Sequence, residues 1–330
     1  MKAKPRVAVI GFGAIGRHHA RNLAQMEGVA FAGIVDPLLS ARVSAESHGY
    51  RVFESIEELL KSPVDAAVVS VPTATHYPIA LQLIDANVVL LIEKPIASTI
   101  EHGLDLIVRS RRRGLPMMIG YVERFNPAII AAQRLIRDGL VGTPFHALTR
   151  RVGAIPPRVR DANVIVDIGV HDIDIISFLL QANLTLISAQ GGMAKMNDRV
   201  DYASLSLDAE GVVANIIVNW VTPVKIRDLT ITGSAGYLQV DYLRQETRFA
   251  PGRDFVPTES YEEIIEQYEA GVLLECPVER REPLRLQLEK FVAVLHGAEY
   301  PDPEIALRSL RVALEATEMI ERKLRVKVVK

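Results

Sequence analysis

The sequence opens with an apolar run and a glycine pattern that together restrict the possible folds strongly. Residues Val7 to Ile10 are all apolar, and glycines follow at 11, 13 and 16 before a run with helical spacing. Strand, G-x-G-x-x-G and helix in this order predict a dinucleotide-binding turn. Gly11 would allow a tight turn, Gly13 a close approach to pyrophosphate, and Gly16 close packing of helix on strand. The pyrophosphate would lie at the helix N-terminus, where unpaired N–H groups favour an anion.

A second apolar run, 29–35, ends at Asp36, 20 residues after Gly16. An acidic side chain at this place accepts hydrogen bonds from the adenosine ribose hydroxyls and repels a 2′-phosphate. The next cation, Arg42, is six residues further on. We therefore expect NAD rather than NADP; the alternative is an acid that only caps the next helix. The predicted contacts in this region are Gly11, Phe12, Gly13, Ala14, Ile15, Gly16 and Asp36.

Composition sets further limits. The 330 residues suffice for about two domains of ordinary size. The 38 basic and 40 acidic side chains nearly cancel, which indicates neither a nucleic-acid nor a membrane partner. The single cysteine, Cys276, excludes an intramolecular disulfide framework and fits a reducing compartment. Without a secretion signal or a long uncharged apolar stretch in the sequence, we expect a cytoplasmic protein.

The first third of the chain alternates strands with helices. The expected strands after the second are 51–53, 65–71, 88–92 and 116–119, and the expected helices are 39–48, 56–60, 76–86 and 99–113. Each strand is a continuous apolar run, which is typical of a parallel sheet covered on both faces. We therefore predict an α/β domain, a doubly wound Rossmann domain, over residues 1–121.

From residue 122 the pattern changes. The expected elements are a helix at 126–138, strands at 145–152, 185–191, 202–208, 212–221 and 226–233, and amphipathic helices at 284–295 and 303–323. In 202–208, alternate residues are apolar, which is the period of a sheet with one face on a core. We predict an α+β domain over residues 122–330, with a large, mostly antiparallel sheet flanked by helices.

The segment 212–221 differs from the other strands of this sheet because both of its faces look mostly apolar. It includes Ile216, Ile217, Val218 and Trp220. Helices can cover one face of a sheet, and a second subunit is a natural cover for the other. We therefore expect a homodimer or homotetramer joined through this sheet.

The expected strand 88–92 runs directly into Glu93-Lys94-Pro95. Residues just past the C-terminal end of a parallel strand face the ligand crevice. Lys94 is therefore well placed to reach a bound substrate, although taken alone it could be a surface lysine in a turn.

The second reactive group is V-D-I-G-V-H-D-I-D, residues 166–174. A helix that starts near Asp167 would bring Asp167, His171 and Asp174 near one face. A histidine beside a carboxylate can act as a base near neutral pH, and the carboxylate can orient its ring. A metal site and an ordinary helix pair are the alternatives. One histidine without a cysteine is a thin ligand set, so we expect no metal.

Together and in this order, the motifs resemble the Gfo/Idh/MocA family of NAD(P)-dependent sugar and cyclitol oxidoreductases. The motifs are G-F-G-A-I-G, Asp36, S-V-P-T-A-T-H (70–76), Glu93-Lys94-Pro95, G-Y-V-E-R-F-N-P (120–127) and D-I-G-V-H-D-I-D. The specific part is Glu-Lys-Pro followed about 75 residues later by Asp-x-x-x-His. The resemblance covers essentially the whole chain and implies that Lys94, Asp167 and His171 surround the reacting hydroxyl.

The resemblance also implies the remaining contacts. Cofactor contacts beyond the glycine loop would be Val71, Pro72, Thr73, His76, Glu93, Lys94 and Tyr121. Substrate contacts would be Lys94, Arg124, Asn126, Arg158, Arg160 and His171. The segment 120–122 has no Asn, which many members carry there at the nicotinamide ribose.

Several segments are similar to family members that act on UDP-linked sugars. Arg158 and Arg160, in a Pro-rich loop, could then meet a diphosphate, or could be solvated loop arginines. The expected reaction is oxidation of a secondary hydroxyl of a sugar, nucleotide-linked, with NAD as hydride acceptor. The alternatives are a free-sugar or inositol dehydrogenase and a non-catalytic NAD-binding regulator on the same fold. A regulator would be free to lose Lys94 or His171, and both are present.

Overall fold

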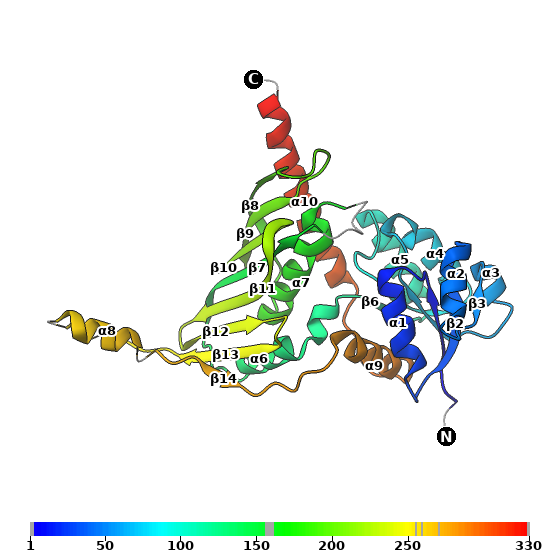
Figure 1. Ribbon diagram of the computed structural model, residues 1–330, viewed down its shortest axis with the longest axis horizontal. Helices are drawn as coiled ribbons and strands as arrows, with labels where there is room; N and C mark the ends of the chain where they lie inside the picture. Colours follow the sequence, from blue (N-terminus) through cyan, green and yellow to red (C-terminus); the bar gives the residue numbers. More distant parts are fainter. Residues whose placement is uncertain (1–2, 156–161, 255, 259, 270, 329–330) are drawn as a thin grey trace. The chain divides into compact units, whose positions relative to one another are not determined.

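The computed structural model of the protein describes residues 3–155, 162–254, 256–258, 260–269 and 271–328 (Figure 1). The chain divides into two compact units. The first unit consists of Met1–Val122 and Glu282–Leu310, and the second of Glu123–Arg281 and Arg311–Lys330. Among the described helices, none is both long and apolar enough to cross a membrane.

The first unit is built on a six-stranded sheet in which every neighbouring pair is parallel. Its strands are β1 (Arg6–Ile10), β2 (Ala30–Val35), β3 (Val52–Phe53), β4 (Ala66–Val69), β5 (Val89–Ile92) and β6 (Met117–Ile119). Their spatial order is β3-β2-β1-β4-β5-β6, which is the order of dinucleotide-binding sheets. The predicted doubly wound fold is confirmed, and ligands bind such sheets where the order reverses, between β1 and β4.

The helices between these strands begin at residues that the sequence marks. They are α1 (Ala14–Ala24), α2 (Leu39–Glu46), α3 (Ile56–Leu59), α4 (His76–Asp85) and α5 (Ile100–Arg112), with a 3-10 turn η1 (Thr73–Thr75). Ser55 caps α3 and Thr99 caps α5, each accepting a hydrogen bond from a backbone N–H of the first turn. All four residues of β4 are fully buried, because helices cover both faces of the sheet.

The helix α9 (Pro283–Leu295) belongs to the first unit, whereas the sequence grouped residues 122–330 in one domain. It packs on α1. The Asn22 side chain donates to Glu282 at 3.0 Å, and the Arg285 guanidinium donates to the Asn22 carbonyl at 3.1 Å. An amphipathic pattern shows that a helix has a face to bury, but it does not show which sheet covers that face. The sequence therefore could not assign α9.

The second unit contains an eight-stranded sheet of order β14-β13-β12-β11-β7-β10-β9-β8. The strands are β7 (Pro144–Ala154), β8 (Thr185–Gly192), β9 (Tyr202–Ala209), β10 (Val212–Asn219), β11 (Val221–Gly233), β12 (Gly236–Asp241), β13 (Glu246–Pro251) and β14 (Leu274–Cys276). Only the central neighbours β7 and β10 are parallel among the described pairs, so the predicted mostly antiparallel sheet is confirmed. The last three strands were not predicted, because they are short and carry mixed polarity.

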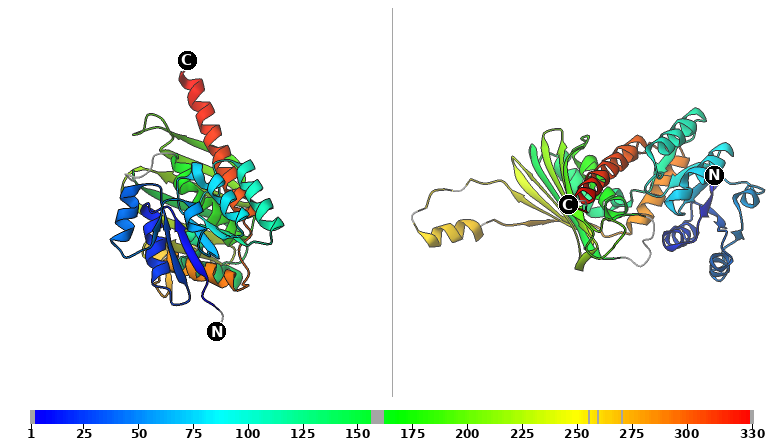
Figure 2. Two further views of the ribbon diagram at one scale, coloured as in Figure 1. Left: turned by 90° about the vertical axis from the view of Figure 1, so that its right-hand side faces the viewer. Right: turned by 90° about the horizontal axis from the view of Figure 1, so that it is seen from above.

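Helices of the second unit pack on one face of this sheet (Figure 2). They include α6 (Pro127–Arg137), α7 (Val170–Leu180) and the part of α10 (Glu304–Val328) that begins at Arg311, since the start of α10 belongs to the first unit. The helix α8 (Tyr261–Glu269) lies in the connection between β13 and β14. Short turns η2 (Val122–Phe125) and η3 (Ile165–Gly169) precede α6 and α7.

The two-sided apolar character expected for β10 is only partly present. Ile216, Val218 and Trp220 all lie on the helix-covered face and are at most 1% exposed. Ile217 is on the other face and 37% exposed, and its neighbours there are polar, since the Asn215 amide bonds the His146 ring at 3.0 Å. The open face is thus mixed, because alternation in β10 puts most of its apolar residues on one side. Association of subunits through this face stays a prediction.

A buried ion cluster joins α7 to the sheet beneath it. Arg151 on β7 donates three hydrogen bonds of 2.9 to 3.1 Å to the carboxylate of Asp172 on α7. The same guanidinium donates to Glu123 at 2.7 Å, and Arg227 on β11 lies 3.6 Å from that carboxylate. The side chains of Arg151 and Asp172 are 2% and 1% exposed. Two arginines therefore face two carboxylates, and of the four side chains only that of Arg227 is substantially exposed, at 29%.

Opposing effects set the pKa values in this cluster. Burial acts to lower the pKa of Arg151, but the charges of Asp172 and Glu123 outweigh it and the pKa is raised. Burial acts to raise the pKa of Glu123, and the arginines outweigh it, so that pKa is lowered. Burial raises the pKa of Asp172 against the attraction of Arg151. Since Arg151 stays charged and donates three bonds to Asp172, the cluster holds together as ion pairs.

We predict that Arg151→Met destabilises the second unit by about 3 to 5 kcal/mol, because it leaves two buried carboxylates without their main cation. The matched control is Arg150→Met on the neighbouring residue, whose half-exposed side chain pairs with Asp228 on the open face and should contribute less than about 1 kcal/mol. Urea unfolding followed by fluorescence of Trp220, the single tryptophan, reports this unit. Equal effects of the two substitutions would contradict the role assigned to Arg151.

Candidate active site

In the first unit, packing requires two glycines of the loop and leaves the third facing open space. Gly11 has a φ of +92°, and a Cβ there would stand 2.6 Å from the carbonyl oxygen of Ser70. A Cβ at Gly16 would overlap the carbonyl oxygen of Gly11. A Cβ at Gly13 would meet nothing within 4 Å. The backbone at Gly13 and the start of α1 is therefore open to an anionic ligand, which fits a dinucleotide pyrophosphate.

Asp36 lies at the end of β2 and is tied to this loop. One carboxylate oxygen accepts a hydrogen bond from the N–H of Phe12 at 2.8 Å, and the other accepts one from Leu38 at 2.9 Å. Each oxygen keeps a further lone pair for a ribose hydroxyl. Arg42 folds back onto the carbonyl oxygens of Asp36 and Pro37, at 2.9 and 2.8 Å. A cation thus lies closer to Asp36 than the sequence separation suggested.

The other predicted cofactor residues follow the C-terminal ends of β4, β5 and β6, which are neighbouring strands of the sheet. They lie in the connecting loops, except for His76, which begins α4. His76 is 1% exposed, and its ring nitrogens lie 2.9 Å from the Pro95 carbonyl oxygen and 3.0 Å from that of Val71. Burial lowers the pKa of His76, and the hydrogen bonds to the two carbonyl groups oppose the shift. His76 therefore ties the loop after β4 to the Glu-Lys-Pro loop.

Glu93 has a partner that the sequence analysis missed. The ring of His19, on α1, lies 2.8 Å from one oxygen of the Glu93 carboxylate, and the N–H of Lys94 donates to the other at 3.3 Å. The His19 side chain is fully buried. This pair fixes the start of the Glu-Lys-Pro loop against α1. Lys94 itself is half-buried, and Tyr121 is buried just after β6. No sequence signal distinguishes His19 from an ordinary helix residue.

In the second unit, Asp167 lies in the π-helical turn η3 and His171 in the first turn of α7. Both side chains are half-buried. Asn163 accepts hydrogen bonds from the N–H groups of Ile165 and Val166 at 2.9 and 3.0 Å, which fixes where the turn begins. Turns of the π type are rare and occur often at functional sites. The single α-helical start predicted near Asp167 is corrected to a π turn that leads into the helix.

The arginine Arg227 is a further residue that sequence reasoning missed. Burial lowers its pKa, and repulsion from Arg151 adds to this effect. The charges of Glu123, Asp172 and Asp167 act in the opposite direction. Arg227 therefore links the buried cluster electrostatically to Asp167. Because Arg151 holds the residue next to His171, the cluster also fixes how α7 is rotated.

Three other residues have structural partners. Asp174 is fully buried and forms a two-bond ion pair with Arg124, so its carboxylate has a structural partner. Asn126 is 2% exposed, caps α6 through the Ala128 N–H and donates to the carbonyl of Tyr242 at 3.1 Å. Arg124 and Asn126 thus form buried structural contacts that the sequence did not predict.

Two predicted substrate residues, Arg158 and Arg160, lie outside the described residues. Within the part of the chain that is described, no group of three His, Cys, Asp or Glu side chains could hold a metal ion. The predicted catalytic set is divided, with Lys94 in the first unit and Asp167 and His171 in the second.

Comparison with known proteins agrees with both units. Residues 5–121 match the oxidoreductase family with an NAD-binding Rossmann fold, and residues 129–239 match the GFO/IDH/MocA C-terminal domain. UDP-N-acetylglucosamine 3-dehydrogenase of Acidithiobacillus ferrooxidans is 33% identical over 239 residues, 72% of this chain and 74% of that protein.

Two further similarities follow the same lines. A crystal form of the Acidithiobacillus enzyme superimposes with a TM-score of 0.83 at 28% identity, over 96% of this chain and 98% of that one. The scyllo-inositol 2-dehydrogenase (NAD(+)) of Bacillus subtilis is 30% identical over 199 residues, 58% of each chain. The open glycine loop, the Glu-Lys-Pro loop and the Asp-x-x-x-His turn thus stand on a shared two-unit fold. The chain belongs to the Gfo/Idh/MocA family of NAD-dependent oxidoreductases, dehydrogenases that act on CH–OH groups.

Proposed function

We propose that this dehydrogenase oxidises a secondary hydroxyl of a nucleotide-linked sugar to a ketone, in the manner of a UDP-N-acetylglucosamine 3-dehydrogenase. The observation that carries the proposal is the similarity to the Acidithiobacillus enzyme over nearly three quarters of both chains. The open backbone at Gly13 and the carboxylate of Asp36 support NAD as the hydride acceptor.

In the proposed reaction the carbinol carbon gives up a hydride, and the hydroxyl gives up a proton. Bound NAD supplies the electrophilic nicotinamide carbon that accepts the hydride. The His171 imidazole takes the hydroxyl proton, and Asp167 orients the ring and stabilises its charged form. The Lys94 ammonium stabilises the negative charge that develops on the substrate oxygen. The base and the cation could exchange roles. The products are ketone, NADH and one proton.

Oxidation of a free cyclitol is a second candidate, because a relative 30% identical to this chain acts as a scyllo-inositol dehydrogenase. A diphosphate needs cations to bind it, and a free cyclitol does not.

We predict that NADH forms with UDP-N-acetylglucosamine. Arg158→Ala/Arg160→Ala should raise the KM for this substrate at least about tenfold with little change in kcat, as expected for lost ground-state binding. Turnover of scyllo-inositol alone, followed by NADH absorbance, would favour the second candidate.

For the cofactor, we predict that NADH binds at least about tenfold more tightly than NADPH, because Asp36 would bond the ribose hydroxyls and repel a 2′-phosphate. Asp36→Ala should remove most of this difference. Arg42, which already lies at the Asp36 carbonyl, can then bind the 2′-phosphate, so Asp36→Ala/Arg42→Ala should bind NADPH more weakly than Asp36→Ala does.

Titration of cofactor fluorescence measures the dissociation constants of NADH and NADPH without a substrate. The control is Glu46→Ala, an exposed acid further along α2, which should leave both constants unchanged. Equal affinity of the wild-type protein for NADH and NADPH would contradict the proposed role of Asp36.

For the catalytic residues, we predict that Lys94→Ala and His171→Ala each lower kcat about 10²-fold or more, the usual contribution of a general acid or base. Asp167→Asn should cost less if this carboxylate only orients the ring. NADH affinity and melting temperature should change little, because the glycine loop and Asp36 carry cofactor binding.

The matched controls are the exposed residues Lys61→Ala and His102→Ala, which should keep normal turnover. Turnover and thermal unfolding are to be measured on the same preparations. Near-normal turnover of His171→Ala, or a loss of activity that only follows a loss of folded protein, would overturn the assigned roles.

A further inference from the structure

The connection between β13 and β14, residues 252–273, is called the arm here. Figure 1 and Figure 2 both show its helix α8 beyond the ends of the sheet strands. The Gln267 side chain binds the backbone of Val256 twice, accepting from its N–H and donating to its carbonyl oxygen, both at 2.8 Å. These bonds tie α8 to the chain segment that leads into it from β13.

The helix α8 is amphipathic and acidic. Its sequence, Y-E-E-I-I-E-Q-Y-E, contains four glutamates and no basic residue. Tyr261 and Ile264 share one face and are 72% and 40% exposed. An isolated helix of fewer than about 12 residues is marginal in water, and most helices are stabilised by packing of an apolar face. We therefore expect the exposed face at Tyr261 and Ile264 to pack on another apolar surface.

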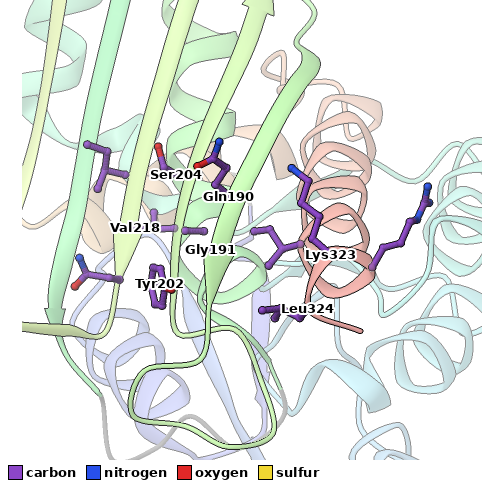
Figure 3. A pocket seen from close by; sticks show the side chains of 12 residues that line it. Gln190, Gly191, Tyr202, Ser204, Val218, Lys323 and Leu324 are labelled. Carbon is purple, nitrogen blue, oxygen red and sulfur yellow. The ribbon is translucent and has the colours of Figure 1, made fainter. Parts of the chain in front are cut away.

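A groove of about 800 Å³ lies at the opposite edge of the same sheet, between the end of α10 and strands β8 to β10. Its accessible apolar lining comes from Tyr202 and Ile217, which are 42% and 37% exposed, and from the half-buried Leu324 (Figure 3). Val218 and Ile320 also line the groove, but they are at most 1% exposed. The groove thus offers apolar surface on one helix and two strands, and amphipathic helices bind in apolar grooves of this kind.

The rim of this groove has the charge opposite to that of α8. Arg322 and Lys323 line it, and the segment Arg322–Val328 contains four basic residues and no acidic one. The ion pairs of Arg322 with Glu318 and of Arg325 with Glu321 are largely exposed, so they cost little to rearrange. Four glutamates thus lie on α8 at one edge of the sheet, and four basic residues, two of them paired with Glu318 and Glu321, lie at the other edge.

The length of the arm shows which groove α8 can enter. Only four residues, 270–273, join the end of α8 to β14, and the five Cα–Cα steps from Glu269 to Leu274 span at most about 18 Å. Even β10, the lining strand nearest to β14, is five strand spacings away, about 24 Å. The C-terminal end of α8 therefore cannot reach the groove of its own chain.

We propose that α8 of one copy of this chain docks in the α10 groove of a second copy. The apolar face at Tyr261 and Ile264 would cover the exposed lining at Tyr202 and Leu324, and the glutamates would meet the basic rim. Reciprocal exchange of two arms gives a closed two-fold assembly. This inference concerns the assembly of the protein and does not depend on the proposed substrate.

Charge reversal tests the proposal. The arm variant Glu262→Lys/Glu266→Lys places two cations against the basic rim, and the groove variant Arg322→Glu/Arg325→Glu places two acids against the acidic helix. By sedimentation velocity we expect each variant alone to fall to a smaller species, with its association weakened at least tenfold. An equimolar mixture of the two variants should regain the wild-type mass, because each arm then meets a groove of opposite charge.

Two controls keep the outcome interpretable. Glu27→Lys/Glu46→Lys, at exposed positions of the first unit, changes the net charge as much as the arm variant does and should keep the wild-type mass. Ile264→Asp, which removes the apolar contact, should dissociate the assembly without rescue by the groove variant. The proposal would be overturned by a monomeric wild type, by charge variants of unchanged mass, or by a mixture that stays dissociated. Melting temperatures equal to that of the wild type establish that the variants are folded.

Discussion

The first unit depends on a contact between α1 and β1 that is too close for any side chain. A Cβ at Gly16 would overlap the carbonyl oxygen of Gly11, so the helix can start where it does only because both positions are glycine. This closeness directs the first N–H groups of α1 toward the switch point between β1 and β4. Asp36 then reaches the same loop and holds it through the Phe12 N–H. The cofactor site is thus a consequence of backbone packing more than of reactive side chains.

In the second unit, buried ion pairs position the helix α7. Arg151 joins β7, α7 and the turn η2 through Asp172 and Glu123, and a second pair joins Arg124 to Asp174. Buried ion pairs are a weak source of stability when compared with apolar packing, but they define geometry, because a shifted helix would leave a buried charge unpaired. Here they determine which face of α7 carries His171.

How much of this the sequence predicts depends on the range of each interaction. The glycine pattern, the apolar strands and Asp36 are local signals, and they predicted the doubly wound parallel sheet. The location of α9, the pairing of Asp174 with Arg124 and the contact of His19 with Glu93 join residues 50 or more positions apart, and no periodicity encodes them. Alternation in β10 was visible, but the two asparagines on its open face received too little weight against Val213 and Ile217.

The most direct test of the central claim follows the hydrogen that is transferred. UDP-N-acetylglucosamine carrying deuterium at C3 is incubated with the protein and NAD, and the recovered NADH is analysed by mass spectrometry. A dehydrogenase that acts on this hydroxyl by hydride transfer should give NADH heavier by one deuterium, with none lost to water, and Lys94→Ala should slow its formation. NADH without deuterium, or no NADH in the presence of intact folded protein, would contradict the account.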